Sequence, residues 1–211
     1  MGKRIALLLF AVLSLRALPS AASSSLENPT RERLGAHIGY VASIGNLHDK
    51  YGDGYDFVLY FTECLIRTLD LHIQIGATYM GDLLDAELAE RLSLLEGTTT
   101  EIRFAYLSLG PQYRWLLDDT KTLHGAFGMG IYSVTILQDT GLEAFDVSDQ
   151  HFGMNGGVGF LWRLTENWSA EVSLIAHWVG TDSNSYLYTF TDGGTNPSLF
   201  SLGVGAAFDL R

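Results

Sequence analysis

Apolar residues alternate with polar or small residues along most of this chain, and this alternation constrains the fold more than any other feature. It is clearest near the C-terminus, where residues 201–210 place their apolar side chains at every second position. A period of two predicts β-strands that have one apolar face. The apolar positions of this segment are Leu202, Val204, Ala206, Phe208 and Leu210.

The same alternation recurs upstream, mostly in long stretches. Strands of ten or more residues suit a tilted membrane crossing, which needs about 9–11 residues, better than the ~5–6 residues typical of globular sheets. Pro111 predicts a bulge or an edge disturbance in its strand. We therefore expect an all-β fold, an antiparallel transmembrane up-and-down barrel of about eight strands. The strands are expected near residues 33–45, 55–62, 69–77, 100–113, 124–137, 151–164, 168–179 and 201–210.

The expected connections alternate between short and long, as they do in outer-membrane barrels. Short turns are predicted at 64–68, 118–121 and 165–167, and long loops at 45–54, 80–99, 138–149 and 180–197. Trp115, Trp162 and Trp168 lie close to short turns, where aromatic side chains would meet the membrane interface. This order places both termini on the periplasmic side. Within the second long loop, residues 82–95 have helical spacing and predict a short external helix.

The N-terminus has the features of a secretory signal. Lys3 and Arg4 precede an apolar run, and Ser20, Ala21 and Ala22 follow it. The run ends at Leu15 and is shorter than the ~20 residues of a membrane-spanning helix. We expect residues 1–22 to be a cleaved signal peptide and residues 23–211 to form one outer-membrane barrel domain.

Composition excludes some classes of function. The chain has 24 acidic and 13 basic residues and a net charge of −11, which argues against nucleic-acid binding. Its single cysteine cannot form an internal disulfide. The histidines lack the HxH and HExxH spacings of metal sites. We predict no cofactor and no metal.

One strand-turn-strand segment resembles a known family. It reads HFGMNGGVGFLWRLTENWSAEVSLIAHW, from His151 to Trp178, and is similar to the outer-membrane β-barrel domain of the OmpA/OmpX type. The resemblance implies a small, eight-stranded, monomeric protein among outer-membrane lipids and lipopolysaccharide. The last strand resembles the signal read by the barrel-assembly machinery, although the chain ends on Arg211 instead of an aromatic residue. The positions that match this signal are Ser201, Gly203, Ala206 and Phe208.

Strand parity also predicts which polar side chains face the lumen. Charged groups enclosed there must be paired or hydrated, so we expect a structural network, in preference to a catalytic or transport site. The predicted network comprises Asp70, His72, Glu101, Arg103, Arg163 and Glu171. The same parity directs His37, His124, Asn155 and His177 inward.

The leading hypothesis is a non-enzymatic integral outer-membrane protein that contributes to envelope structure or to surface interaction through its external loops. One alternative resembles OmpW, a carrier of small hydrophobic molecules with an apolar lumen. Another resembles the outer-membrane lipid A deacylase, with His177 in a suggestive place. In that comparison Val179 stands where the nucleophilic serine should be.

Overall fold

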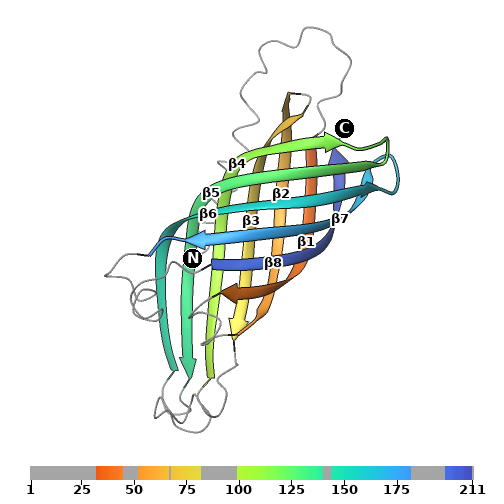
Figure 1. The fold of residues 1–211 in the computed structure, drawn as a ribbon. Helices are drawn as coiled ribbons and strands as arrows, with labels where there is room; N and C mark the ends of the chain where they lie inside the picture. The colour runs from red at the N-terminus through yellow and green to blue at the C-terminus, as the bar shows by residue number, and fades with distance from the viewer. Residues whose placement is uncertain are drawn as a thin grey trace.

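Eight antiparallel strands pair in chain order and close into a barrel (Figure 1). The computed structural model describes residues 32–44, 52–66, 68–81, 99–139, 144–181 and 198–210. The expected all-β barrel is confirmed, whereas the predicted signal peptide and the helix expected at 82–95 lie outside the described residues. The strands are β1 (Glu32–Ile44), β2 (Gly54–Ile66), β3 (Leu69–Gly81), β4 (Thr99–Leu116), β5 (Lys121–Asp139), β6 (Ala144–Arg163), β7 (Trp168–Val179) and β8 (Ser198–Leu210).

Closure joins the first strand to the last. β1 pairs with β8 along its whole length, from Glu32 opposite Leu210 to Ile44 opposite Ser198. We call the end of the barrel that holds Glu32 and Leu210 the turn end, because the short connections 67–68, 117–120 and 164–167 also lie there. The opposite end is the loop end. Among the described residues, no helix is long and apolar enough to span a membrane.

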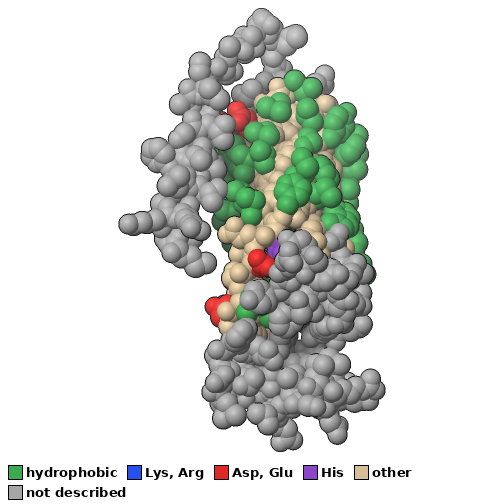
Figure 2. Space-filling view, turned by 90° about the vertical axis from the view of Figure 1, so that its left-hand side faces the viewer, with side chains coloured by type: hydrophobic (Ala, Val, Ile, Leu, Met, Phe, Trp, Pro, Cys, Tyr) green, Lys and Arg blue, Asp and Glu red, His purple; other side chains and the backbone are tan. Residues whose placement is uncertain are grey.

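Alternation sorts the side chains between the two faces of the wall. In β8, Leu202 and Val204 are each 58% exposed, whereas Ser201 of the same strand is 1% exposed. Figure 2 shows hydrophobic side chains covering much of one side of the barrel. We call this outer surface the apolar belt. It includes Leu34, Ile38, Phe57, Leu59, Ile75, Leu109, Phe127, Met129, Ile131, Val158, Val172, Leu174, Leu202 and Val204.

Exposed aromatic side chains border the belt. Trp115, Trp162 and Trp168 lie at or near the turn end, as their sequence positions predict. The Trp168 ring packs at 4.9 Å from that of Phe208, measured between centroids. Aromatic side chains in this position suit a boundary between hydrocarbon and headgroups.

The connection between β5 and β6 differs from the prediction. We expected a long loop at 138–149, but β5 continues to Asp139, and β6 begins at Ala144, directly opposite it. The loop prediction was therefore wrong, and the alternation of short and long connections fails here. The sequence misled because the part of the β4–β5–β6 sheet that lies beyond the belt needs no apolar outer face, so its residues do not alternate regularly.

Proline disturbs β4 less than predicted. The ladder between β4 and β5 is interrupted at Gly110 and Pro111, and it resumes with Gln112 opposite Ala126 in the same register. Proline lacks the N–H that the ladder needs, which accounts for the gap. The register shift lies elsewhere, in β2 between Cys64 and Ile66.

The turn between β4 and β5 is held by a side chain. Both the backbone N–H and the hydroxyl of Thr120 donate to Asp118 Oδ1, each at 2.8 Å. These hydrogen bonds favour the ionised carboxylate and lower the pKa of Asp118 to about 2. The carboxylate of Asp118 that holds the turn therefore stays ionised near neutral pH.

Tyrosine rings inside the barrel cover glycines on neighbouring strands. A Cβ on Gly35 would lie 2.1 Å from the ring of Tyr60, and a Cβ on Gly76 would lie 2.3 Å from that of Tyr106. Each glycine stands opposite its tyrosine in the ladder. The absence of a side chain thus makes the space in which the ring lies.

We predict that Gly76→Ala destabilises the barrel by about 1–3 kcal/mol, because the methyl group displaces the buried Tyr106 ring. Gly156→Ala is the matched control, since a Cβ there meets no atom closer than 3.7 Å. The control should stay within about 0.5 kcal/mol of the parent. The temperature at which the folded gel band is lost measures both variants. Equal temperatures for Gly76→Ala and the parent would contradict the assignment.

Candidate functional site

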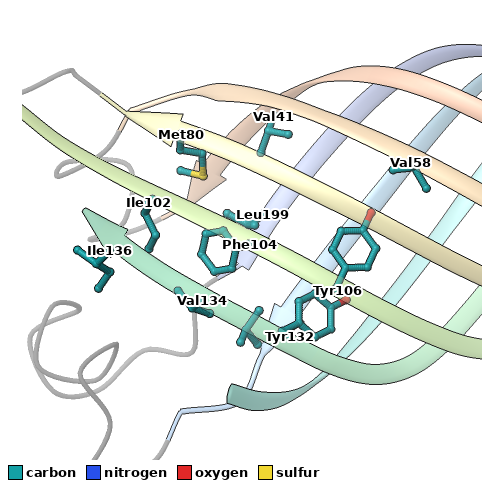
Figure 3. Packing of buried hydrophobic residues seen from close by; sticks show 11 residues of the cluster. Val41, Val58, Met80, Ile102, Phe104, Tyr106, Tyr132, Val134, Ile136 and Leu199 are labelled. Atoms are coloured by element: carbon teal, nitrogen blue, oxygen red, sulfur yellow. The ribbon is translucent and has the colours of Figure 1, made fainter. Parts of the chain in front are cut away.

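The barrel interior is filled in three tiers, of which the one nearest the loop end is apolar. Figure 3 shows its side chains pointing into the space that the strands enclose. We call this the apolar tier, and it closes the lumen toward the loop end. Its members are Val41, Val58, Met80, Ile102, Phe104, Tyr106, Tyr132, Val134, Ile136, Val179 and Leu199.

The apolar tier reverses the predicted parity of one strand. Ile102 is 0% exposed inside the barrel, so Glu101 and Arg103 face outward, and their predicted place in the lumen network is wrong. They pair with each other instead, Arg103 Nε donating to Glu101 Oε1 at 2.6 Å. The prediction took apolar side chains as the mark of the outer face. Near the loop end the inner face is the apolar one.

The aromatic members of the apolar tier meet the polar middle tier at Tyr106 and Tyr132, where they contact His177 of the middle tier. Tyr106 and Tyr132 stack at 5.2 Å between ring centroids, and the His177 ring lies 4.8 Å from that of Tyr106. The Tyr132 hydroxyl is 3.0 Å from His177 Nδ1. Below it Asn155 Nδ2 donates to Ser108 Oγ at 2.7 Å. The hydroxyl of Tyr132 and the amide of Asn155 thus join the aromatic rings to the polar side chains of the middle tier.

Glu171 lies at the centre of the middle tier. The Tyr60 hydroxyl donates to Glu171 Oε2, and His124 Nε2 is 3.3 Å from Glu171 Oε1. His37 and His72 line the same cavity, and His37, 4% exposed, has no hydrogen-bond partner on either ring nitrogen among the described residues. The volume that the centre of a water molecule can occupy here is about 20 Å³. About 10–15 Å³ suffices for one water, so the cavity has room for about one.

Two buried ion pairs form the tier at the turn end. Arg33 Nε lies 2.7 Å from Asp209 Oδ1, and Arg114 Nε lies 2.7 Å from Asp70 Oδ2. Arg114 also donates to Cys64 Sγ at 3.3 Å. Each guanidinium thus neutralises one carboxylate at low exposure, and the pairing offsets part of the cost of enclosing the charges.

The structure places half of the predicted network inside the barrel. His72 and Glu171 line the middle cavity, whereas Asp70 pairs with Arg114 at the turn end. Arg163, the last residue of β6, is only partly buried. The parity prediction also holds for the other four inward residues, which are buried: His37, His124, Asn155 and His177.

The predicted network omitted Arg33, Asp209 and Arg114, which form the ion pairs at the turn end. Strand parity could have identified Arg33 and Asp209, since Arg33 is four positions before His37 and therefore on the same face. Arg114 lies one residue beyond the predicted strand end at 113, so the alternation did not place it. Strand ends are where a parity argument is weakest.

The geometry bears on three possible activities: metal binding, lipid deacylation and the carriage of a hydrophobic molecule. Among the described residues, no group of three or more His, Cys, Asp or Glu side chains is arranged to hold a metal ion. His177 and Val179 both face the interior, the latter within the apolar tier, so neither presents a group to a lipid outside the barrel. The apolar tier is a cluster of buried side chains in contact with one another, so within the described residues it resembles a protein core more than the lining of an open lumen.

The sequence matches no family model and no curated protein. The structure, in contrast, is similar to several solved barrels. Neisserial surface protein A aligns with a TM-score of 0.56 at 12% identity, over 85% of this chain and 97% of that one. A major outer membrane protein from Thermus thermophilus aligns with a TM-score of 0.56 at 16% identity, over 85% and 99% of the two chains.

Ail, the attachment invasion locus protein of Yersinia pestis, aligns with a TM-score of 0.51 at 13% identity, over 88% of this chain and 100% of that one. The fold is that of a small outer-membrane β-barrel. Identities this low carry the likeness of fold alone. The eight-stranded outer-membrane barrel is therefore the architecture that this chain shares with them.

We predict that Asp70→Ala destabilises this outer-membrane barrel by about 3–5 kcal/mol, because Arg114 would stay buried without its carboxylate. Glu101→Ala is the matched control at the exposed Arg103 pair, and it should cost no more than about 1 kcal/mol. The rate at which the folded gel band disappears in hot detergent measures both. The assignment fails when the two variants unfold equally fast.

Proposed function

We propose that the chain is a non-enzymatic integral protein of the outer membrane that contributes to envelope structure or to surface interaction. The apolar belt carries this proposal. Large hydrophobic side chains are exposed on every strand of the wall, while charged and polar groups fill much of the interior. A protein surrounded by water would invert this arrangement, whereas hydrocarbon favours it.

The sealed interior supports a role outside the lumen. The apolar tier blocks the loop end, and the middle cavity has room for about one water. Among the described residues, this filling leaves little room for a steady aqueous path or for a small hydrophobic cargo. The surface that remains for recognition is the loop end.

Polar groups at the loop end suit this role. Beyond the belt, β4–β6 present Glu101, Arg103, Asp146 and Asp149 on or near the surface. Outer-membrane lipids and lipopolysaccharide are the partners that this position favours, and we expect the barrel to be monomeric. Export through a signal peptide at residues 1–22 remains a prediction.

Assembly by the barrel-assembly machinery is part of the proposal. In β8 the predicted signal residues divide between the two faces, Ser201 and Gly203 inward and Ala206 and Phe208 outward. Phe208 packs on Trp168 at the turn end, and β8 closes the barrel with β1. The barrel-assembly machinery would bind these positions before β8 pairs with β1.

We expect the protein to fractionate with outer membranes and to migrate on gels as a heat-modifiable band. Val204→Arg should weaken insertion into lipid vesicles by about 2–4 kcal/mol, because it places a charge in the middle of the belt. Leu117→Arg, in a turn, is the matched control and should cost about 0–1 kcal/mol. Recovery of the protein as a water-soluble periplasmic monomer would overturn the proposal.

The envelope role predicts two further observations. Cells lacking the protein should show greater sensitivity to detergents or weaker surface attachment, restored by the parent gene. The purified barrel in planar bilayers should show no steady conductance, since the apolar tier is filled. Reproducible channel openings at neutral pH would replace the envelope role with transport.

A further inference from the structure

The described interior of the barrel holds more histidines than carboxylates that could pair with them. The ion pairs Arg33–Asp209 and Arg114–Asp70 cancel at the turn end. Four buried histidines remain in the middle tier, with only two further buried carboxylates, Asp56 and Glu171. The four are His37, His72, His124 and His177.

Three of these histidines share one cavity with Glu171. His37, His72 and His124 line it from β1, β3 and β5, and Glu171 reaches it from β7. His124 is the one beside the carboxylate, at 3.3 Å. A proton taken up by His124 would therefore gain an ion pair, whereas protons on the other two would bring like charges into the same small space.

The ring nitrogens are placed to take up those protons. Both nitrogens of His37, and Nδ1 of His72 and of His124, have no hydrogen-bond partner among the described residues. A water in the cavity would bring protons within reach of them. No second carboxylate of the described residues lines the cavity, because Asp56 lies further along β2, against Gly39 beside Ser201.

The surroundings of the cluster offer little further compensation. β6 contributes Asn155, which does not titrate, and the two guanidinium groups are neutralised by their own carboxylates. Asp56 is the further carboxylate whose charge acts on His37. The titratable or charged groups of the interior, from the middle tier and from the tiers beside it, are Arg33, Asp56, Tyr60, Asp70, Tyr106, Arg114, Tyr132, Glu171, His177 and Asp209.

We propose that His37, His72 and His124 around Glu171 form an acid-sensitive switch within the barrel. The neutral cluster keeps the middle tier closed, and uptake of more than one proton loosens it by repulsion between imidazolium groups. The unfolded chain, whose histidines are free to charge, then binds more protons than the folded barrel. Stability rises with pH in that case, so it falls as the medium is acidified through the range in which free histidine titrates.

The test compares unfolding of the full-length barrel, folded in detergent micelles, at pH ~7.5 and pH ~5, either side of the ordinary histidine pKa. The rate at which the folded gel band is lost at one temperature and ionic strength is the readout. We expect the parent to unfold at least about tenfold faster at the lower pH, the change that one proton shifted by one pKa unit produces. A triple variant, His37→Gln with His72→Gln and His124→Gln, should lose most of that acceleration.

His151→Gln is the matched control. His151 is also buried in the barrel wall but lies in the part of β6 near the loop end, 3.8 Å from Asp149 and outside the cavity. Its substitution should leave the acceleration unchanged. The proposal is overturned when the triple variant and the parent accelerate equally, or when His151→Gln removes the effect.

Two further measurements test the proposal if the triple variant does not fold. His37→Gln alone costs no hydrogen bond that the structure shows, so it should fold and retain a smaller acceleration than the parent. In parallel, carbon and nitrogen NMR shifts of labelled histidines follow protonation in the intact parent. Titration of these rings as in free histidine, with an unchanged unfolding rate, would refute the switch.

Discussion

Pairing between β1 and β8 is the interaction on which the rest of the structure depends. Where all eight strands lie side by side it leaves no strand edge, so the backbone N–H and C=O groups of the crossing strands find partners within the barrel. A wall of this kind tolerates apolar side chains on its outside. It also encloses a narrow interior, which the remaining side chains must fill.

The interior meets that demand differently at each level. Near the loop end it is filled as a protein core is, with apolar side chains such as Phe104 and Leu199. At the turn end, ion pairs such as Arg33–Asp209 supply matched charge. The middle holds imidazoles and one small cavity, where polar atoms outnumber their partners. Among the described residues, unpaired buried polar atoms are therefore concentrated at the centre of the barrel.

How much the sequence revealed depended on the strand. In β7 and β8 the outer positions are mostly apolar and most inner ones are polar or small, so parity alone placed Glu171 and His177 correctly. In β4 both faces carry apolar residues, and the assignment of Glu101 was inverted. The register between strands that are distant in sequence decides which tier a residue occupies, as it does for Arg114 beside Asp70. No local sequence pattern predicts this register.

The length of β6 gives the barrel an uneven outline. Its 20 residues, at about 3.3 Å each, span about 66 Å. A strand tilted by ~45° needs only about 42 Å to cross ~30 Å of hydrocarbon. In a bilayer that leaves roughly 20 Å of β6, braced by β5, standing clear of the acyl chains (Figure 1). The molecule would then carry an extension of hydrogen-bonded sheet on one side of its rim. A partner that binds there would contact this sheet at a fixed distance from the lipid.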